Sequence, residues 1–319
     1  MLLTPGARLV ALAVGALAMT SAGAPQQPTY RGTNETVRVF VTVIDKDGRL
    51  VTTLTKDQFE ARDDGKPQPI TVFDNSPQPI QIVVLLDVSG SMVGNLALLR
   101  AASTQLFKAL GPDDVARVGT FGRDVVISPE FTHDIGALEA ALPDRILENT
   151  PTPMWRAIDD AMDGFDVKSE RRRVVLILSD GKDTGPVGFS RRVSSQAGVI
   201  DRARTDSVMV YGVGLESRGP RQPVGLGAGG LSSMLAADLP DPGLARTADE
   251  TGGGYAEVRP RDDLSKAFAE IARELHSQYL LGYEPPKRDG KTHRIEVRVS
   301  AKGLTPRARK SYVAPKAGS

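Results

Sequence analysis

The sequence contains no cysteine and only three histidines among its 319 residues. The lack of cysteine excludes disulfides, thiolate nucleophiles and metal sites built on sulfur. The chain also lacks an excess of charge of one sign, because its forty basic and thirty-nine acidic side chains leave a formal net charge of +1. A chain without a broad positive field has no general attraction for nucleic acid or for an acidic membrane surface. Any metal site must therefore use oxygen ligands or the few histidines, and we expect no nucleic-acid partner.

Long apolar runs are scarce, with one exception near the start of the chain. Arg8 supplies a positive charge, residues 9–19 are apolar or small, and small residues follow up to Ala24. This is the layout of a secretory signal peptide, and the run is shorter than the ~18 residues typical of a membrane-spanning helix. We therefore expect residues 1–24 to be a signal peptide, the chain to be secreted or periplasmic, and no integral membrane segment to remain. Cleavage after Ala22 is an equal alternative, and an uncleaved N-terminal anchor is another.

Two stretches of β character flank a central part of different composition. Residues 25–35 are rich in Pro, Gln, Thr and Gly and are typical of a linker. Residues 36–78 and 279–315 contain alternating apolar and polar residues between turn signals, which predicts short strands. We expect the two stretches to pair into one small discontinuous β module, with an α/β domain at residues 79–278 inserted between them.

The central part alternates between strand and helix patterns. Continuous apolar runs at residues 82–86 and 174–178 are typical of strands buried on both faces. Apolar residues at helical spacing indicate helices at residues 96–110 and 264–275, among others. This alternation predicts an α/β fold with a doubly wound, mostly parallel sheet covered by helices on both faces. Residues 216–242 are rich in Gly, Pro and Ser and predict a long loop within this domain.

Oxygen-bearing side chains follow the first buried strand. Asp87, Ser89 and Ser91 lie within five residues of one another, where the strand ends and a helix is expected to begin. Ligands of open parallel sheets bind outside the carboxyl ends of the strands, and Gly90 permits a tight turn there. Asp87 is a charge at the edge of an apolar core, which a cation would stabilise. The same residue types also cap helices, so capping is the structural alternative.

Two further loops offer oxygen ligands. Thr150 to Pro153 precede an expected helix, and Ser179 to Asp183 follow another buried strand. In a doubly wound sheet the three loops can meet at one edge. Together they offer an oxygen-only site with too few charges for a typical calcium cage, which suits magnesium or manganese. For Asp183, a role beside the metal and a role in the turn remain equal alternatives.

The combination of these loops resembles a known family. Asp87-x-Ser89-x-Ser91 is similar to the metal-ion-dependent adhesion site of von Willebrand factor A domains, whose best-known relatives are the integrin I domains. Thr152, in Thr-Pro-Met-Trp-Arg-Ala, resembles the threonine ligand of the family. Asp180, in Leu-Ser-Asp-Gly, resembles its second aspartate. The resemblance extends over residues 80–278 and implies the Rossmann-like fold of the family.

The resemblance also implies a set of roles. The metal ligands would be Asp87, Ser89, Ser91, Thr152 and Asp180, with the two aspartates binding directly or through water. The metal would be magnesium (Mg²⁺), with Mn²⁺ or Ca²⁺ as alternatives, and an Asp or Glu carboxylate of a protein partner would complete its coordination. The expected function is therefore non-enzymatic, adhesion-type protein binding. An envelope scaffold or assembly protein with a structural or vestigial metal site is the alternative. A metal-dependent hydrolase is disfavoured because no separate base accompanies the site.

The flanks also resemble known sequences. With Gln278 to Pro285 on the C-terminal side, they resemble the flanks of exported bacterial proteins related to von Willebrand factor A.

The remaining motifs favour ordinary structural roles. Asp45-x-Asp47-Gly48 starts like a calcium loop but lacks its later ligands, so we expect a hairpin turn. Gly225-x-Gly227-x-x-Gly230 matches a dinucleotide fingerprint without the preceding buried strand, so we expect a loop. We expect packing or surface roles for His133, His276 and His293. For Trp155 we expect core packing, with a place at the rim of a binding face near the site as the alternative.

Overall fold

The computed structural model describes residues 36–146, 150–166, 168–180, 183–184, 194–215, 242–259 and 262–316. The predicted signal peptide, the linker, residues 216–241 of the predicted loop and the glycine motif among them lie outside these residues, whereas Pro242, the last residue of the predicted loop, begins a helix. The described part of the chain belongs to one compact unit that extends from Glu35 to Ser319. Within it, no helix has the length and apolar character that crossing a membrane requires.

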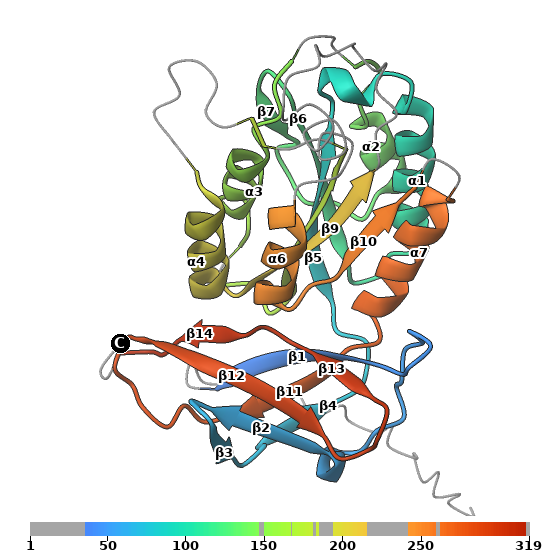
Figure 1. The fold of residues 1–319 in the computed structure, drawn as a ribbon. Helices are drawn as coiled ribbons and strands as arrows, with labels where there is room; N and C mark the ends of the chain where they lie inside the picture. Colours follow the sequence, from blue (N-terminus) through green and yellow to red (C-terminus); the bar gives the residue numbers. More distant parts are fainter. Residues whose placement is uncertain are drawn as a thin grey trace, which may run out of the picture. The chain divides into compact units, whose positions relative to one another are not determined.

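A six-stranded sheet forms the centre of the inserted domain (Figure 1), with the strand order β10-β9-β8-β5-β6-β7. Its strands are β5 (Ile80–Asp87), β6 (Val115–Phe121), β7 (Val125–Ile127), β8 (Arg172–Ser179), β9 (Val208–Leu215) and β10 (Tyr255–Val258). All neighbouring pairs are parallel except β6 and β7, which are antiparallel. Every residue of β5 and β9 is buried, as the continuous apolar runs predict.

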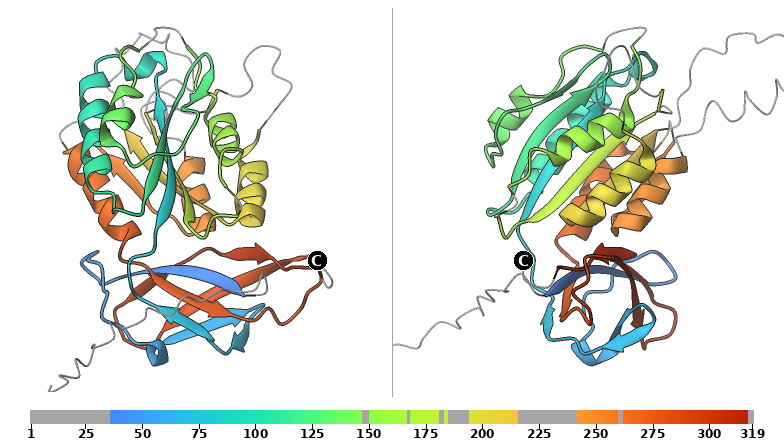
Figure 2. Two further views of the ribbon diagram at one scale, coloured as in Figure 1. Left: turned by 180° about the vertical axis from the view of Figure 1, so that it is seen from behind. Right: turned by 90° about the vertical axis from the view of Figure 1, so that its left-hand side faces the viewer.

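Helices cover both faces of this sheet (Figure 2). The described helices are α1 (Leu96–Lys108), α2 (Ile135–Ala140), α3 (Met154–Met162), α4 (Gln196–Asp206), α6 (Pro242–Thr251) and α7 (Leu264–Leu275). Val84 and Leu86 of β5 share a core with α1, α2 and α7. Val83 and Leu85 face the other way and share a core with α3, α4 and α6. The predicted doubly wound α/β fold is thus confirmed, because alternate residues of one strand enter two separate helix-covered cores.

Two four-stranded sheets form the β part of the chain, with the orders β13-β1-β11-β4 and β14-β12-β2-β3. Their strands are β1 (Val37–Ile44), β2 (Phe59–Asp63), β3 (Lys66–Gln68), β4 (Val72–Asp74), β11 (Tyr279–Tyr283), β12 (Thr292–Val299), β13 (Thr305–Arg307) and β14 (Ser311–Val313). Strands from both flanks share one apolar core. We call these two sheets the β sandwich.

The two flanks of the chain pair directly with each other. β1 and β4, which precede the insert, are antiparallel to β11, which follows it. β2 is likewise antiparallel to β12, with Asp63 opposite Ile295. The predicted pairing of the flanks into one discontinuous module is therefore observed, whereas the domain boundaries given above remain predictions.

Candidate metal centre

The site begins at the carboxyl ends of β5 and β8, which are neighbours in the sheet. Leu86 pairs with Leu178 in a parallel register, so the two strands end at the same level. Asp87 is the last residue of β5, and Ser179, the last of β8, donates its hydroxyl hydrogen bond to Asp87 Oδ2. Asp180 follows Ser179 directly. The apolar runs of the two strands thus place both aspartates at one edge of the sheet.

The loop after β5 turns back toward Asp87. The Ser89 N–H donates to Asp87 Oδ1 at 2.9 Å, and the Met92 N–H donates to the Ser89 carbonyl at 3.0 Å. The Met92 side chain is fully buried beneath the loop and anchors it. This turn directs both serine hydroxyls toward β8: Ser89 Oγ lies 3.1 Å from Ser91 Oγ, which donates to Asp180 Oδ1 at 2.7 Å.

Four of the five predicted ligands therefore lie in one continuous hydrogen-bonded group: Asp87, Ser89, Ser91 and Asp180. Helix capping does not explain them. The Ser89 side chain makes no capping bond to the short 3₁₀ turn Gly90–Met92, and α1 begins after Asn95, whose side chain does not cap either. The serine hydroxyls are thus used on each other and on Asp180, which is the arrangement expected of ligands around a shared ion.

The two carboxylates carry charge that the described surroundings do not neutralise. Asp87 is fully buried and Asp180 is 2% exposed. Burial raises the pKa of Asp87 to about 6, although hydrogen bonds from Ser179 and Ser89 oppose the shift, and the charge of Asp180 adds to it. Burial also raises the pKa of Asp180. Within the described residues, neither aspartate forms an ion pair with a basic side chain. Such a pair of carboxylates favours a bound cation.

One oxygen atom marks where that cation would bind. Asp180 Oδ2 is buried and has no hydrogen-bond partner among the described residues, whereas Asp180 Oδ1 accepts from Ser91. Buried polar atoms in folded proteins almost always have a partner. The donor set around it consists of carboxylate and hydroxyl oxygens, which are the ligands preferred by magnesium. The residues present therefore fit a hard divalent cation.

Thr152, the fifth predicted ligand, is held next to the loop that follows β8. The Thr152 N–H donates to Thr184 Oγ1 at 3.0 Å, and the Thr184 N–H donates to the Thr152 carbonyl at 3.1 Å. Thr152 is buried, at 5% exposed, directly before α3. Its hydroxyl, however, makes no hydrogen bond to the other four ligands in the described part of the chain. The structure thus brings the Thr152 backbone to the β8 loop, while ligation by its side chain stays a prediction.

Two neighbours of the site have structural roles. Asp183 accepts a hydrogen bond from the Trp155 N–H at 3.2 Å and so satisfies a donor in the first turn of α3. The Trp155 side chain is 7% exposed and belongs to the core between the sheet and α3.

Away from the site, Asp45 forms the predicted turn after β1. Its Oδ1 accepts hydrogen bonds from the Asp47 and Arg49 N–H groups at 2.8 and 2.9 Å.

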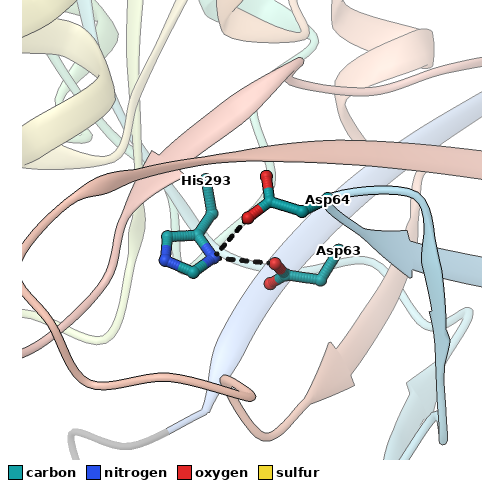
Figure 3. Close-up of side chains that lie close together, drawn as sticks. All are labelled: Asp63, Asp64 and His293. Atoms are coloured by element: carbon teal, nitrogen blue, oxygen red, sulfur yellow. Dashed lines mark hydrogen bonds and ion pairs between the residues drawn. The ribbon is translucent and has the colours of Figure 1, made fainter.

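A second cluster of acidic and histidine side chains was not predicted from the sequence. Asp63, Asp64 and His293 lie together in the β sandwich, with facing side-chain atoms within 4.8 Å of one another (Figure 3). Asp63 and His293 are 230 positions apart in the chain, and only the pairing of β2 with β12 brings them together. No local motif could have indicated this contact.

Comparison with family models gives a match within the inserted domain. Residues 81–230 match the family model of the von Willebrand factor type A domain. No curated protein matches the chain. Similar solved structures include a von Willebrand factor type A protein from Catenulispora acidiphila, with 14% identity, a TM-score of 0.48, and coverage of 89% of this chain and 75% of that chain.

Two other solved structures that are similar to this chain come from a bacterial membrane protein and from the mussel byssus. An aerotolerance-related membrane protein from Bacteroides fragilis has 17% identity and a TM-score of 0.46, and the match covers 61% of this chain and 98% of that one. Proximal thread matrix protein 1 from the mussel byssus, solved with a zinc-occupied metal-ion-dependent adhesion site, has 17% identity and a TM-score of 0.43, with 68% and 50% covered. On the family model, the sheet order and the two helix layers, this chain contains a von Willebrand factor type A domain.

Proposed function

We propose that the chain is a non-enzymatic protein-binding module of the adhesion type, in which a divalent cation at the ends of β5 and β8 receives an Asp or Glu carboxylate of a partner protein. The observation that carries the proposal is the buried Oδ2 of Asp180, which has no hydrogen-bond partner among the described residues, beside a fully buried Asp87. The ligands would be Asp87, Ser89, Ser91, Thr152 and Asp180, and the ion would be magnesium, with manganese or calcium as alternatives.

The residues of the site support this role in two ways. Asp87 accepts hydrogen bonds from the Ser179 hydroxyl and from the Ser89 N–H, which hold its carboxylate in place at the end of β5. Ser91 is the exposed member of the group and marks the side that faces solvent. When bound, an ion held partly by neutral hydroxyls keeps much of its positive charge for a partner carboxylate. A partner would thus approach from the Ser91 side of the loop.

Metal binding is tested by thermal melts of the wild type and of single variants. Mg²⁺ or Mn²⁺ should raise the melting temperature of the wild type, with a stabilisation of about 2.7 kcal/mol at a hundredfold excess over the dissociation constant. Asp180→Asn should abolish the shift, because it replaces the unpartnered carboxylate oxygen. Asp124→Asn is the matched control, since Asp124 is an exposed acid just beyond the neighbouring strand β6.

Partner binding is tested separately by a pull-down from envelope extract, with magnesium or with EDTA. We expect a partner that the wild type and Asp124→Asn retain only with magnesium, and that Asp180→Asn does not retain. A partner retained equally by all three proteins would instead support the envelope scaffold. A wild-type melting temperature that does not respond to millimolar magnesium or manganese would contradict the metal site itself.

We also propose that the mature chain is secreted or periplasmic. The support is the signal-peptide pattern of residues 1–24. Cell fractionation with a C-terminal tag tests this. Recovery of a shortened protein from the periplasm or medium is expected, and a full-length cytoplasmic product would contradict it.

A further inference from the structure

We propose that His293 is held as a doubly protonated imidazolium between three aspartates, and that this cation is a pH-sensitive latch joining the two flanks of the β sandwich. The cluster lies apart from the proposed metal centre and does not depend on the function proposed there. It comprises Asp63 at the end of β2, Asp64 in the following turn, Asp289 before β12, and His293 on β12.

Both ring nitrogens of His293 lie close to carboxylate oxygens, and Figure 3 draws the contacts that one of them makes with Asp63 and Asp64. Nδ1 lies 2.8 Å from Asp63 Oδ1 and 3.2 Å from Asp64 Oδ2. Nε2, at the other end of the ring, lies 3.2 Å from Asp289 Oδ1. An ionised carboxylate only accepts hydrogen bonds, and a neutral imidazole carries a single N–H donor. Donation at both ends therefore requires the imidazolium form.

Asp63 needs a cation, because its side chain is completely buried. Its second oxygen, Oδ2, accepts hydrogen bonds from Tyr283 at 3.1 Å and from Tyr312 at 2.7 Å. Burial raises the pKa of both tyrosines, and the negative charge of Asp63 adds to the shift, so the two hydroxyls stay neutral donors. They satisfy the oxygen but leave its charge unpaired. The proton on His293 supplies the missing positive charge.

The other charged groups around the ring are peripheral. The side chains of Asp64 and Asp289 keep 51% and 31% of their exposure, so water screens them more than it screens Asp63. Arg309 lies over the Tyr312 ring with its guanidinium carbon 6.0 Å from the centroid, and Lys316 neighbours Asp289 through an isolated β-bridge. The short contact between His293 and the fully buried Asp63 is therefore the dominant charge pair of the cluster.

The spacing of the cluster alone would also admit a metal ion. Metal sites on histidine use one neutral ring nitrogen, with the other donating to a carboxylate. Here the facing atoms of Asp63 and His293 are already paired with each other, and Asp63 Oδ2 is filled by two tyrosines. The cluster therefore has no orphaned atom comparable to Asp180 Oδ2. A second proton on the His293 ring accounts for every contact of the cluster, so we assign a protonated histidine there instead of a metal ion.

The latch connects parts of the chain on opposite sides of the insert. Asp63 belongs to β2, before the inserted domain, whereas His293, Tyr283 and Tyr312 belong to β12, β11 and β14, after it. Burial lowers the pKa of His293, but hydrogen bonds with Asp63 and Asp289 outweigh burial and raise it. A raised pKa means that the stabilisation is complete below about pH 6.5 and is lost as pH rises through the pKa of the folded state. The sandwich should therefore loosen on the alkaline side.

NMR titration of the folded wild type tests the protonation state directly. The chain has three histidines, and His133→Gln and His276→Gln assign the remaining ring signal to His293. We expect His293 to titrate above about pH 6.5, the ordinary value of the histidine side chain. Titration of His293 at or below that pH would overturn the proposal. This measurement needs no variant of His293 to fold.

Thermal melts in EDTA from about pH 6 to about pH 9 test the linkage to stability. The wild type and His133→Gln should lose melting temperature as pH rises, whereas His293→Gln should start lower and change less. Equal slopes for all three would overturn the latch. So would, in separate melts without EDTA, a zinc-induced rise in melting temperature that persists in Asp180→Asn and vanishes in His293→Gln, because the cluster would then hold a metal instead of a proton.

Discussion

Asp114 shows how one buried side chain fixes the start of the central strand. It accepts hydrogen bonds from the Ile80 N–H at 2.9 Å, the Gly111 N–H at 2.7 Å and His276 Nε2 at 2.6 Å. Burial raises the pKa of Asp114, but the hydrogen bonds from His276, Ile80 and Gly111 outweigh it, so the pKa lies below its ordinary value. A lowered pKa stabilises the fold above the unfolded-state pKa, and the stabilisation is lost as pH falls through the folded-state pKa.

Asp114→Asn should therefore lower the free energy of unfolding at pH 7 by about 1–3 kcal/mol, because three donors lose their charged acceptor. The difference from the wild type should shrink below about pH 4, where the wild-type carboxyl also begins to gain a proton. Urea unfolding at the two pH values measures both effects. Asp113→Asn, at the exposed neighbouring position, should match the wild type. A difference that is the same at both pH values would contradict the charge argument.

At the residue scale, the sequence predicts the location of side chains that directly follow a buried strand. Asp87 and Asp180 follow apolar runs that form adjacent parallel strands, so their proximity follows from local patterns. The contact of Asp63 with His293 depends on the register of two strands far apart in the chain, which no local pattern encodes. The side-chain direction of Thr152 depends equally on loop packing, which no local pattern encodes, so ligation by its hydroxyl stays a prediction.

At the scale of elements, the turn between α6 and β10 packs against the β sandwich. Gly252 has φ +83°, and a Cβ there would lie 2.4 Å from the Arg309 backbone nitrogen. Gly303 has a similar φ of +75° but has open space around it. The two glycines share the same backbone requirement and differ in what surrounds them.

Gly303→Ala should therefore cost only the strain of a left-handed residue, about 1–2 kcal/mol. Gly252→Ala should cost clearly more, because backbone atoms on both sides must also separate. Chemical denaturation of both variants against the wild type measures the difference. Equal losses would mean that the α6–β10 turn does not press against the sandwich.

Elements with strong periodicity were predicted to within a few residues, and weak ones were missed. The apolar spacing of residues 264–275 matches α7 in full, and the helix expected at residues 96–110 ends two residues earlier, at Lys108 of α1. By contrast, α6 begins with Pro242 and Gly243 and contains few apolar residues, so its pattern does not indicate a helix. β10 is a four-residue edge strand after three glycines, and its formation depends on pairing with β9.

At the scale of the whole chain, Glu274 of α7 joins the inserted domain to the sandwich. Its Oε1 accepts from Thr42 of β1 at 3.0 Å, from Tyr211 of β9 at 2.7 Å and from Arg307 of β13. The Glu274 side chain is 16% exposed, so its charge is poorly screened. One carboxylate oxygen thus serves three strands from both parts of the chain.

Glu274→Ala should lower the free energy of unfolding by about 2–3 kcal/mol, since the partly buried Arg307 and two hydroxyls lose their acceptor. We also expect the wild type to unfold in a single calorimetric transition, and this transition to broaden or divide in the variant because the two parts lose a shared contact. Glu270→Ala is the control on the same helix, where the exposed pair with Lys266 contributes little. A sharp, unshifted transition in Glu274→Ala would contradict the coupling.

The position of β5 has a mechanical consequence. The strand leaves the sandwich at Ile80 and ends at Asp87, and it is bonded laterally to β6 and β8 along its length. A partner pulling on the Asp87 end would load both ladders in shear, so that many bonds share the tension at once. A strand at the sheet margin would instead detach one bond at a time. If the proposed metal centre binds a partner, β5 would therefore transmit tension between that partner and the β sandwich.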